Sequence, residues 1–426
     1  MIDRKIAPSI HDAIEFDYIL PPINEQKLSN GLPLYWLNAG VQDVVEIDWV
    51  FPAGMWYEQK PSVAQAIGGL LKNGTSTRTA HQINEALEFY GASLKVNAGN
   101  DLSVVTLYTM TKHLPDLLPI VYEILTDATF PEQEVMIHKQ NAIQRLLVNL
   151  RQGDFVANQR IDARIFGEFH PYGRYSKKEK IEALTREDLI AFYKQNYNLA
   201  NVKIFMAGKV SEKEVKWLDN VFGKAPVTAS EITSETFAAP GPGEKKLHEI
   251  NDANGVQGAI RIGRKFFNRH HPDFAPMVVL NTLFGGYFGS RLMSNIREEK
   301  GYTYGIYSSL APYTHCGSII IHTEVGRDVV APAIEEVYKE MALLQNELAD
   351  EEELLLVKNY LLGNMLGDLD GPFSILQRWR TLILHGMTIE HFNRNVNIYK
   401  NITAQDLQKL AQQYYDKNDF YEVVVI

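Results

Sequence analysis

An arginine and a tyrosine at the end of one glycine-rich stretch are the side chains best placed to do chemistry in this sequence. Arg297 and Tyr304 lie in Gly285-Gly-Tyr-Phe-Gly-Ser-Arg-Leu-Met-Ser-Asn-Ile-Arg-Glu-Glu-Lys-Gly-Tyr-Thr-Tyr304. A guanidinium and a phenol both donate hydrogen bonds, and the guanidinium stays charged at any working pH. If both side chains reach one carbonyl oxygen, they can stabilise the negative charge that develops there. The pair therefore predicts a carbonyl-binding clamp.

The elements around this pair are expected to bring it to a sharp helix-to-strand corner. Gly285 and Gly286 predict a turn, and Ser290 is placed to cap a helix whose apolar positions recur at helical spacing. Gly301 is the expected left-handed end of that helix, and a strand is predicted over residues 302–307. Many structural segments share this pattern. A phosphate-binding loop is disfavoured because no Lys-Ser or Lys-Thr follows the glycines.

Length, charge and composition exclude several classes of protein. The chain has 426 residues, 45% of them hydrophobic, which predicts two or more globular domains. A net charge of -10 argues against general nucleic-acid binding, which requires a basic face. No apolar run approaches the length of a transmembrane segment. No signal peptide is recognisable, so a cytoplasmic location is the default expectation, or a periplasmic one if a leader has been removed.

The order of predicted elements occurs twice along the chain. Residues 1–225 and 245–426 each follow the order strand, helix, strands, long helices, helix and strand. The segment 226–244 between them is rich in Ala, Ser, Thr, Pro and Gly and is predicted to be a linker. The economical interpretation is an α+β protein made of two copies of one unit, each of roughly 200 residues.

Motifs in both halves resemble the M16 family of zinc peptidases, which includes pitrilysin, the insulinase-like enzymes and the mitochondrial processing peptidase. Residues 285–304 resemble the signature of that family's second domain. Further similar segments are Phe51–Gln59, Phe166–Arg174, the run from Ala183, and Leu356–Gly363. The resemblance covers about residues 25–426 and favours a bacterial origin. It implies two homologous LuxS/MPP-like domains, each with a mostly antiparallel sheet and helices packed on one face.

The family's zinc-binding helix carries His-x-x-Glu-His, and the resemblance places those three residues at Gln65, Gly68 and Gly69. The family's third zinc ligand, a Glu on a later helix, falls near Gln144 or Arg145. A neutral amide and two glycines cannot hold a divalent ion, and a nearby cation opposes one. The chain is therefore expected to bind no zinc and to lack catalytic activity alone.

The resemblance also implies a partner, because some M16 relatives divide the zinc helix and the carbonyl-binding pair between two chains. The sequence looks like the metal-free subunit of such a heterodimer, with zinc in the partner and with Arg297 and Tyr304 acting in trans on a peptide. Gly285 and Gly286 would allow close approach of that peptide. The strand Ser93–Ala98 corresponds to the family's substrate-binding edge strand. The alternatives are an inactive scaffold, a stand-alone peptide-binding protein that could be a homodimer, and a metallopeptidase with an unusual site.

Overall fold

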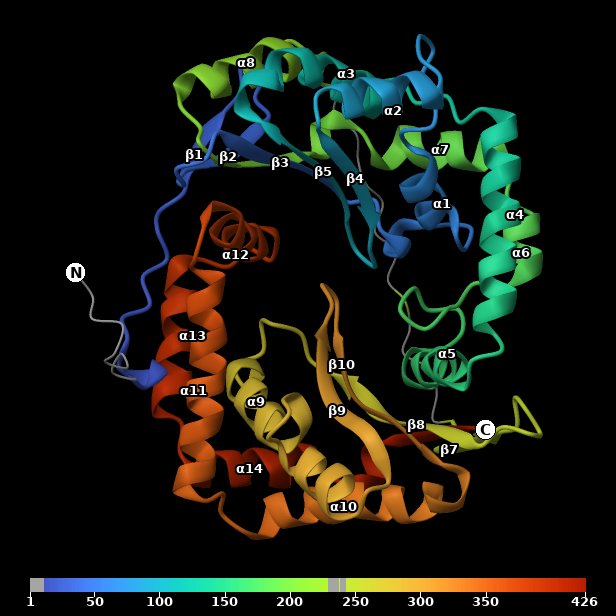
Figure 1. The fold of residues 1–426 in the computed structure, drawn as a ribbon, viewed down its shortest axis with the longest axis vertical. Coiled ribbons are helices and arrows are strands. Elements are labelled where there is room, and N and C mark those ends of the chain that lie inside the picture. The colour runs from blue at the N-terminus through green and yellow to red at the C-terminus, as the bar shows by residue number, and fades with distance from the viewer. Residues whose placement is uncertain (1–10, 229–236, 238–242) are drawn as a thin grey trace, which may run out of the picture.

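The fold is built on two separate β-sheets (Figure 1). The computed structural model describes residues 11–228, 237 and 243–426, so most of the predicted linker 226–244 lies outside the described residues. The first sheet has the strand order β1-β2-β6-β3-β5-β4, and its strands are β1 (Asn24–Lys27), β2 (Pro33–Asn38), β3 (Val44–Phe51), β4 (Ser93–Ala98), β5 (Ser103–Met110) and β6 (Lys203–Gly208). The second sheet has the order β7-β11-β8-β10-β9, and its strands are β7 (Lys246–Glu249), β8 (Gln257–Phe266), β9 (Thr303–Pro312), β10 (Gly317–Gly326) and β11 (Tyr421–Val425).

Both sheets are mostly antiparallel, with one parallel pair each. The parallel pairs are β2 with β6 and β7 with β11. Each sheet takes its strands from one side of segment 229–242, although the boundaries proposed for the two domains stay a prediction.

The helices follow the same division. Those of the first half are α1 (Val63–Leu70), α2 (Ala80–Phe89), α3 (Leu114–Thr126), α4 (Glu132–Asn149), α5 (Gly153–Phe166), α6 (Lys178–Glu182), α7 (Arg186–Asn196) and α8 (Glu212–Phe222). Those of the second half are α9 (Phe274–Asn281), α10 (Val330–Asn346), α11 (Glu351–Asp368), α12 (Pro372–Leu384), α13 (Ile389–Asn401) and α14 (Ala404–Tyr414). Within these described elements, no helix is both long enough and apolar enough to cross a membrane.

One face of each sheet is buried against helices of its own half. In β3 the alternating residues Val45, Ile47 and Trp49 are fully buried in this core, as their period of two predicts. The Trp49 ring packs on Phe222 of α8, with 5.2 Å between the ring centroids. A second core of the same kind joins the second sheet to α10 and α14. The predicted fold class is thereby confirmed.

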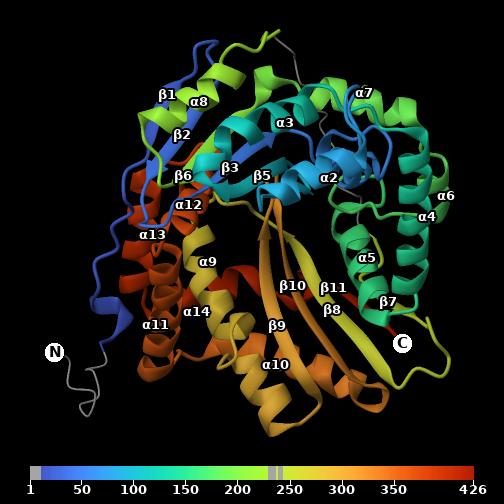
Figure 2. The same ribbon diagram turned by 45° about the horizontal axis from the view of Figure 1, so that its top comes forward.

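The opposite face of each sheet receives a helix from the other half (Figures 1 and 2). Helix α12 packs on β2 and β6 of the first sheet, and α5 packs on β8 and β11 of the second. An ion pair reinforces each contact: Arg380 of α12 bonds to buried Asp48 of β3, and Arg160 of α5 bonds to Glu249 of β7 with distances of 2.7 and 2.9 Å. This exchange of helices was not predicted, and it makes the two halves one interlocked body.

Candidate functional site

The structure brings Arg297 and Tyr304 together at the predicted corner. Two short π-helical segments, η5 (Thr282–Gly286) and η6 (Met293–Glu299), precede β9. Gly301 ends the turn with a φ of +66°, which confirms it as the left-handed terminator. The Nε–H of Arg297 donates to the main-chain carbonyl of Tyr304 over 3.1 Å. The guanidinium therefore fixes the end of β9 while using only one of its five N–H donors.

One local prediction at this corner is wrong. Ser290 was expected to cap the helix, but its Oγ is buried and makes no hydrogen bond to any described residue. Its main-chain carbonyl instead accepts from the N–H of Ser294. The buried position follows from packing, because Ser290 lies between the turn and the second core. Sequence alone does not reveal this, since a serine occurs both as an exposed helix cap and as a small buried residue.

The side chains of the pair point to different surroundings. The Tyr304 side chain is 94% exposed, so its phenol stands in solvent at the edge of the sheet. The Arg297 guanidinium lies over the ring of Phe288, 4.6 Å from its centroid, in a cation–π contact. Its Nη1 is 3.7 Å from the carboxylate of Glu298. The phenol and the guanidinium flank the same strand end without sharing a partner, so a bound carbonyl would have to draw them together.

A cavity of about 240 Å³ lies beside Tyr304 on the α5 side of the second sheet. Arg261 lines it with only 5% of its surface exposed, and its Nε donates to Asn158 over 2.7 Å. Burial and the charge of Arg261 lower the pKa of His322 to about 4, which keeps that imidazole neutral at neutral pH. The carboxylates of Asp154 and Glu324 also line the cavity. The space beside the phenol is thus lined by polar and charged groups.

The outer edge of β9 is largely occupied by the segment that precedes it. Asn281 donates to the carbonyl of Ser308 over 2.9 Å, and the N–H of Ile306 lies 3.3 Å from the sulfur of Met293. Arg297 satisfies the next carbonyl, that of Tyr304. Strand β4 is the corresponding edge strand of the first sheet. There the carbonyl of Leu94 accepts a 3.4 Å hydrogen bond from the flexible Lys72 side chain. Of these two edges, β4 is the better template for an added strand.

The positions of the family's zinc helix lie on α1, and they do not fit a metal ion. Gln65 is exposed, and its Nε2 lies 3.7 Å from the sulfur of Met55. A Cβ atom at Gly69 would lie 2.7 Å from the His138 ring. A side chain at this position would therefore require the His138 ring to move.

The surroundings of this closed site oppose a cation as well. Burial and the nearby charge of Arg145 lower the pKa of His138. Gln144 and Arg145 themselves are exposed on α4. Within residues 11–228 and 243–426, no group of three or more His, Cys, Asp or Glu side chains is arranged to hold a metal ion. The absence of zinc from this chain stays a prediction, since only metal analysis tests it.

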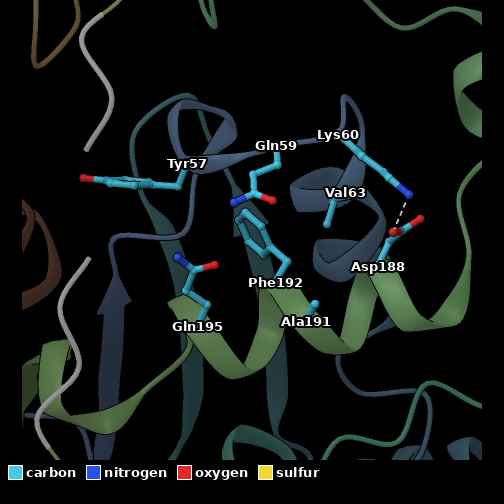
Figure 3. A pocket seen from close by; sticks show the side chains of 8 residues that line it. All are labelled: Tyr57, Gln59, Lys60, Val63, Asp188, Ala191, Phe192 and Gln195. Atoms are coloured by element: carbon cyan, nitrogen blue, oxygen red, sulfur yellow. Dashed lines mark hydrogen bonds and ion pairs between the residues drawn. The ribbon is translucent and has the colours of Figure 1, made fainter. Parts of the chain in front are cut away.

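A buried ion pair holds α1 in place. The Glu58 carboxylate accepts from the N–H of Ala64 over 2.7 Å and from the Arg174 guanidinium over 3.0 Å. Burial raises the pKa of Glu58 to about 7 despite these partners. A small cavity of about 80 Å³ lies alongside, where Lys60 bonds to Asp188 of α7 over 2.5 Å (Figure 3). It has room for several water molecules but not for a peptide.

Two residues that shape the site were not identified from the sequence. His138 fills the space over Gly69 from a helix 69 positions further on, and only their contact reveals it. The ring of Phe288 lies under the Arg297 guanidinium in a cation–π contact. The one available signal was the aromatic residue Phe288 within the glycine-rich turn. An aromatic residue at such a position indicates ordinary packing as readily as a ring that binds a cation.

Comparisons with known proteins give one consistent picture. Residues 183–361 match the family model described as the peptidase M16 inactive domain. An uncharacterized zinc protease of Rickettsia felis is 23% identical over 355 residues, which cover 80% of this chain and 83% of that protein. Another uncharacterized zinc protease, from Bacillus subtilis, is 22% identical over 308 residues, covering 72% of this chain and 74% of that protein.

Solved structures share the fold over nearly the whole chain. A peptidase M16 inactive domain from Pseudomonas fluorescens superposes with a TM-score of 0.83 at 20% identity, covering 95% of this chain and 98% of that one. A protease from Helicobacter pylori gives a TM-score of 0.86 at 16% identity, covering 96% and 100%. At these identities the likeness establishes the fold and leaves the chemistry to the residues of the site.

Proposed function

The chain is a member of the M16 peptidase family, and from this premise we propose that it is the metal-free subunit of a heterodimeric M16 zinc peptidase. In this proposal a second M16 chain carries His-x-x-Glu-His and zinc. The present chain binds peptide and contributes Arg297 and Tyr304 in trans. Bacterial relatives named as zinc proteases support a peptidase setting.

One contrast within the chain carries the proposal. The guanidinium and phenol of the carbonyl clamp stand at an accessible corner beside a cavity, while the zinc-motif positions on α1 hold a neutral amide and two glycines, one of them under the His138 ring. Scattered exposed apolar residues are common, but a phenol and a guanidinium at one strand end form a donor pair.

The mechanism assigns the chain a binding and electrostatic role. A peptide adds to a free strand edge, for which β4 is the candidate, and its main-chain groups fix the register. Gly285, next to the clamp, is buried where a Cβ atom would lie 2.9 Å from Ser308 of β9, so it allows the turn to pack closely on the strand. Gly286 follows it in the turn. Arg297 and Tyr304 then donate to the carbonyl oxygen of the bond being cut, whose charge grows as the partner's zinc-bound water attacks. Because the Nε–H of the guanidinium already donates to the carbonyl of Tyr304, its terminal nitrogens are the donors for substrate.

Tyr304→Phe is the cleanest test, because it removes only the phenol oxygen. The bond from Arg297 goes to the main-chain carbonyl of residue 304, so the corner survives the substitution. In a complex reconstituted with the zinc-bearing M16 chain of the same organism, we expect a loss on the order of 10²-fold in the rate of cleavage of an unfolded peptide. Arg297→Ala should cost at least as much, since it removes the charged donor and loosens the strand end.

Lys300→Ala serves as the matched control, because Lys300 is exposed in the same turn and is placed in no site. Its rate should equal that of the wild type. If Tyr304→Phe and Arg297→Ala also leave the rate unchanged, the chain is a scaffold that only shapes the cavity. If no zinc-bearing chain co-purifies or restores cleavage, the heterodimer is excluded and a stand-alone peptide-binding role takes its place.

A further inference from the structure

The exposed face of helix α11 is uncharged over most of its length. Its exposed positions between Glu352 and Asp368 are Leu355, Leu356, Tyr360, Gly363, Asn364 and Gly367. The Leu356 side chain is the most accessible of the large ones, with 63% of its surface exposed. Single exposed leucines are common on soluble proteins. A helix face without charge instead has the composition of the buried centre of a protein–protein interface.

Gly363 is a glycine although its surroundings leave room for a side chain. Apart from the local backbone, a Cβ atom there would meet no atom within 4 Å. The residue lies inside α11, where glycine weakens a helix relative to almost any other residue. Gly367, one turn further on, is equally open. These two bare positions allow another backbone to approach the helix closely.

This face of α11 continues into the turn that precedes the clamp. The Tyr360 ring packs on Tyr287, with 4.8 Å between the ring centroids. The segment η5, which leads into Tyr287, also contacts α11. The next residue is Phe288, whose exposed ring lies under the Arg297 guanidinium. A molecule that covers α11 therefore lies next to Arg297.

Helix α4 presents a similar face on the opposite side of the molecule (Figure 1). Both helices are 18 residues long and begin with an acidic first turn. In each, the first buried residue, Val135 or Leu354, is followed by two exposed apolar ones, Met136–Ile137 or Leu355–Leu356. The two halves of the chain thus repeat the same exposed apolar pair.

We propose that the exposed faces of α4 and α11 are the two contact surfaces for the zinc-bearing M16 chain, an inference that rests on the proposed function. One partner that covers both faces has to span the molecule, which a chain of the same two-part fold does and a short peptide does not. A second copy is disfavoured, because each copy carries a net charge of -10 and Glu351, Glu352 and Asp368 border the α11 face.

Calorimetric titration of the zinc-bearing M16 chain of the same organism into this chain tests the surface. We expect Leu356→Glu and Ile137→Glu each to weaken binding at least tenfold, because each places a charge in an apolar contact. Gly363→Gln should weaken binding as well. The isolated Gly363→Gln chain should nevertheless unfold no earlier than the wild type, since its side chain enters open space and favours the helix.

Phe89→Glu is the matched control. Phe89 is an exposed apolar residue at the end of α2 that belongs to neither face, so its affinity should equal that of the wild type. The proposal fails if the wild type binds no zinc-bearing chain or if the three variants bind as tightly as the wild type. A loss confined to one of the two helices also overturns it.

The proposed function is tested separately, by the cleavage rate of Tyr304→Phe, whose affinity for the partner should stay at the wild-type value. An unchanged rate, together with weakened binding of Leu356→Glu, refutes the clamp and retains the docking surface. If the wild type instead forms a dimer with itself that Leu356→Glu disrupts, the faces join two copies and the assignment to a zinc-bearing partner is wrong.

Discussion

At the level of single residues, both glycines at the positions that correspond to the family's zinc motif on α1 lie close to neighbouring side chains. Gly68 packs on β4, since a Cβ atom there would lie 3.2 Å from the Cβ of Ala98. Gly69 lies directly under the His138 ring. A side chain at either position would therefore require a neighbouring group to move.

Restoring the motif provides the corresponding prediction. The triple variant Gln65→His, Gly68→Glu, Gly69→His should bind no stoichiometric zinc and should be destabilised by about 1–3 kcal/mol or more, because the new side chains overpack the site. Zinc content after dialysis and the midpoint of chemical unfolding are the measurements. Adding His138→Ala should recover part of the lost stability by making room. Tight zinc binding by the triple variant alone would contradict the closed geometry described for α1.

At the level of elements, local sequence signals predicted more than they missed. The left-handed turn at Gly301 is set by residues a few positions apart, and it was predicted correctly. The π-helical form of η5 and η6 was missed, because apolar spacing alone does not separate it from an α-helix. The proximity of Arg297 and Tyr304 followed from their spacing across one turn. The His138 contact did not, because it depends on how α4 packs on α1.

The contact between strand β3 and helix α12 should respond to pH. Burial, followed by the charge of Asp48, raises the pKa of Glu46 from 4.5 to about 7, while Arg380 opposes the shift. A carboxyl whose pKa is raised in the folded state stabilises the fold fully below its unfolded pKa and loses that contribution as pH rises through the folded value. The stability that Glu46 contributes therefore declines between about pH 4.5 and pH 7.

Glu46→Gln tests this titration. Relative to the wild type, the variant should gain stability between pH 5 and pH 8, because the neutral amide avoids the cost of a half-buried charge beside Asp48. Unfolding midpoints at both pH values, compared with those of a substitution at exposed Glu25 on β1, give the difference. A constant difference between Glu46→Gln and the wild type across this range would show that Glu46 ionises as it does in the unfolded chain.

At the level of the whole molecule, the exchange of α5 and α12 decides how the chain unfolds. The face of the first sheet under α12 contains buried Leu37, Val50 and Phe205, which pack with Ile375 and Leu376 of that helix. A repeat detected in the sequence suggests two independent domains, because each half contains its own strands and core helices. The exchanged helices leave no local trace in the sequence, and neither does the hydrogen bond that Asp101 of the first half accepts from the N–H of Thr314 of the second. The interlocking therefore could not be predicted.

Each half should therefore depend on the other for stability. Expressed alone, residues 1–228 would expose the apolar face that α12 covers, and residues 243–426 would expose the face of β8 and β11 under α5. We expect neither fragment to show a cooperative unfolding transition, whereas the co-expressed pair should associate and unfold in one step. Size-exclusion chromatography and calorimetry of the fragments and the pair measure this.

Arg380→Ala leaves Asp48 buried without its partner and should weaken the association, while Arg327→Ala, at an exposed turn, should not. Two fragments that each fold stably alone would mean that the exchanged helices are attachments to finished domains, and a partner chain could then open the molecule between its halves without unfolding either one.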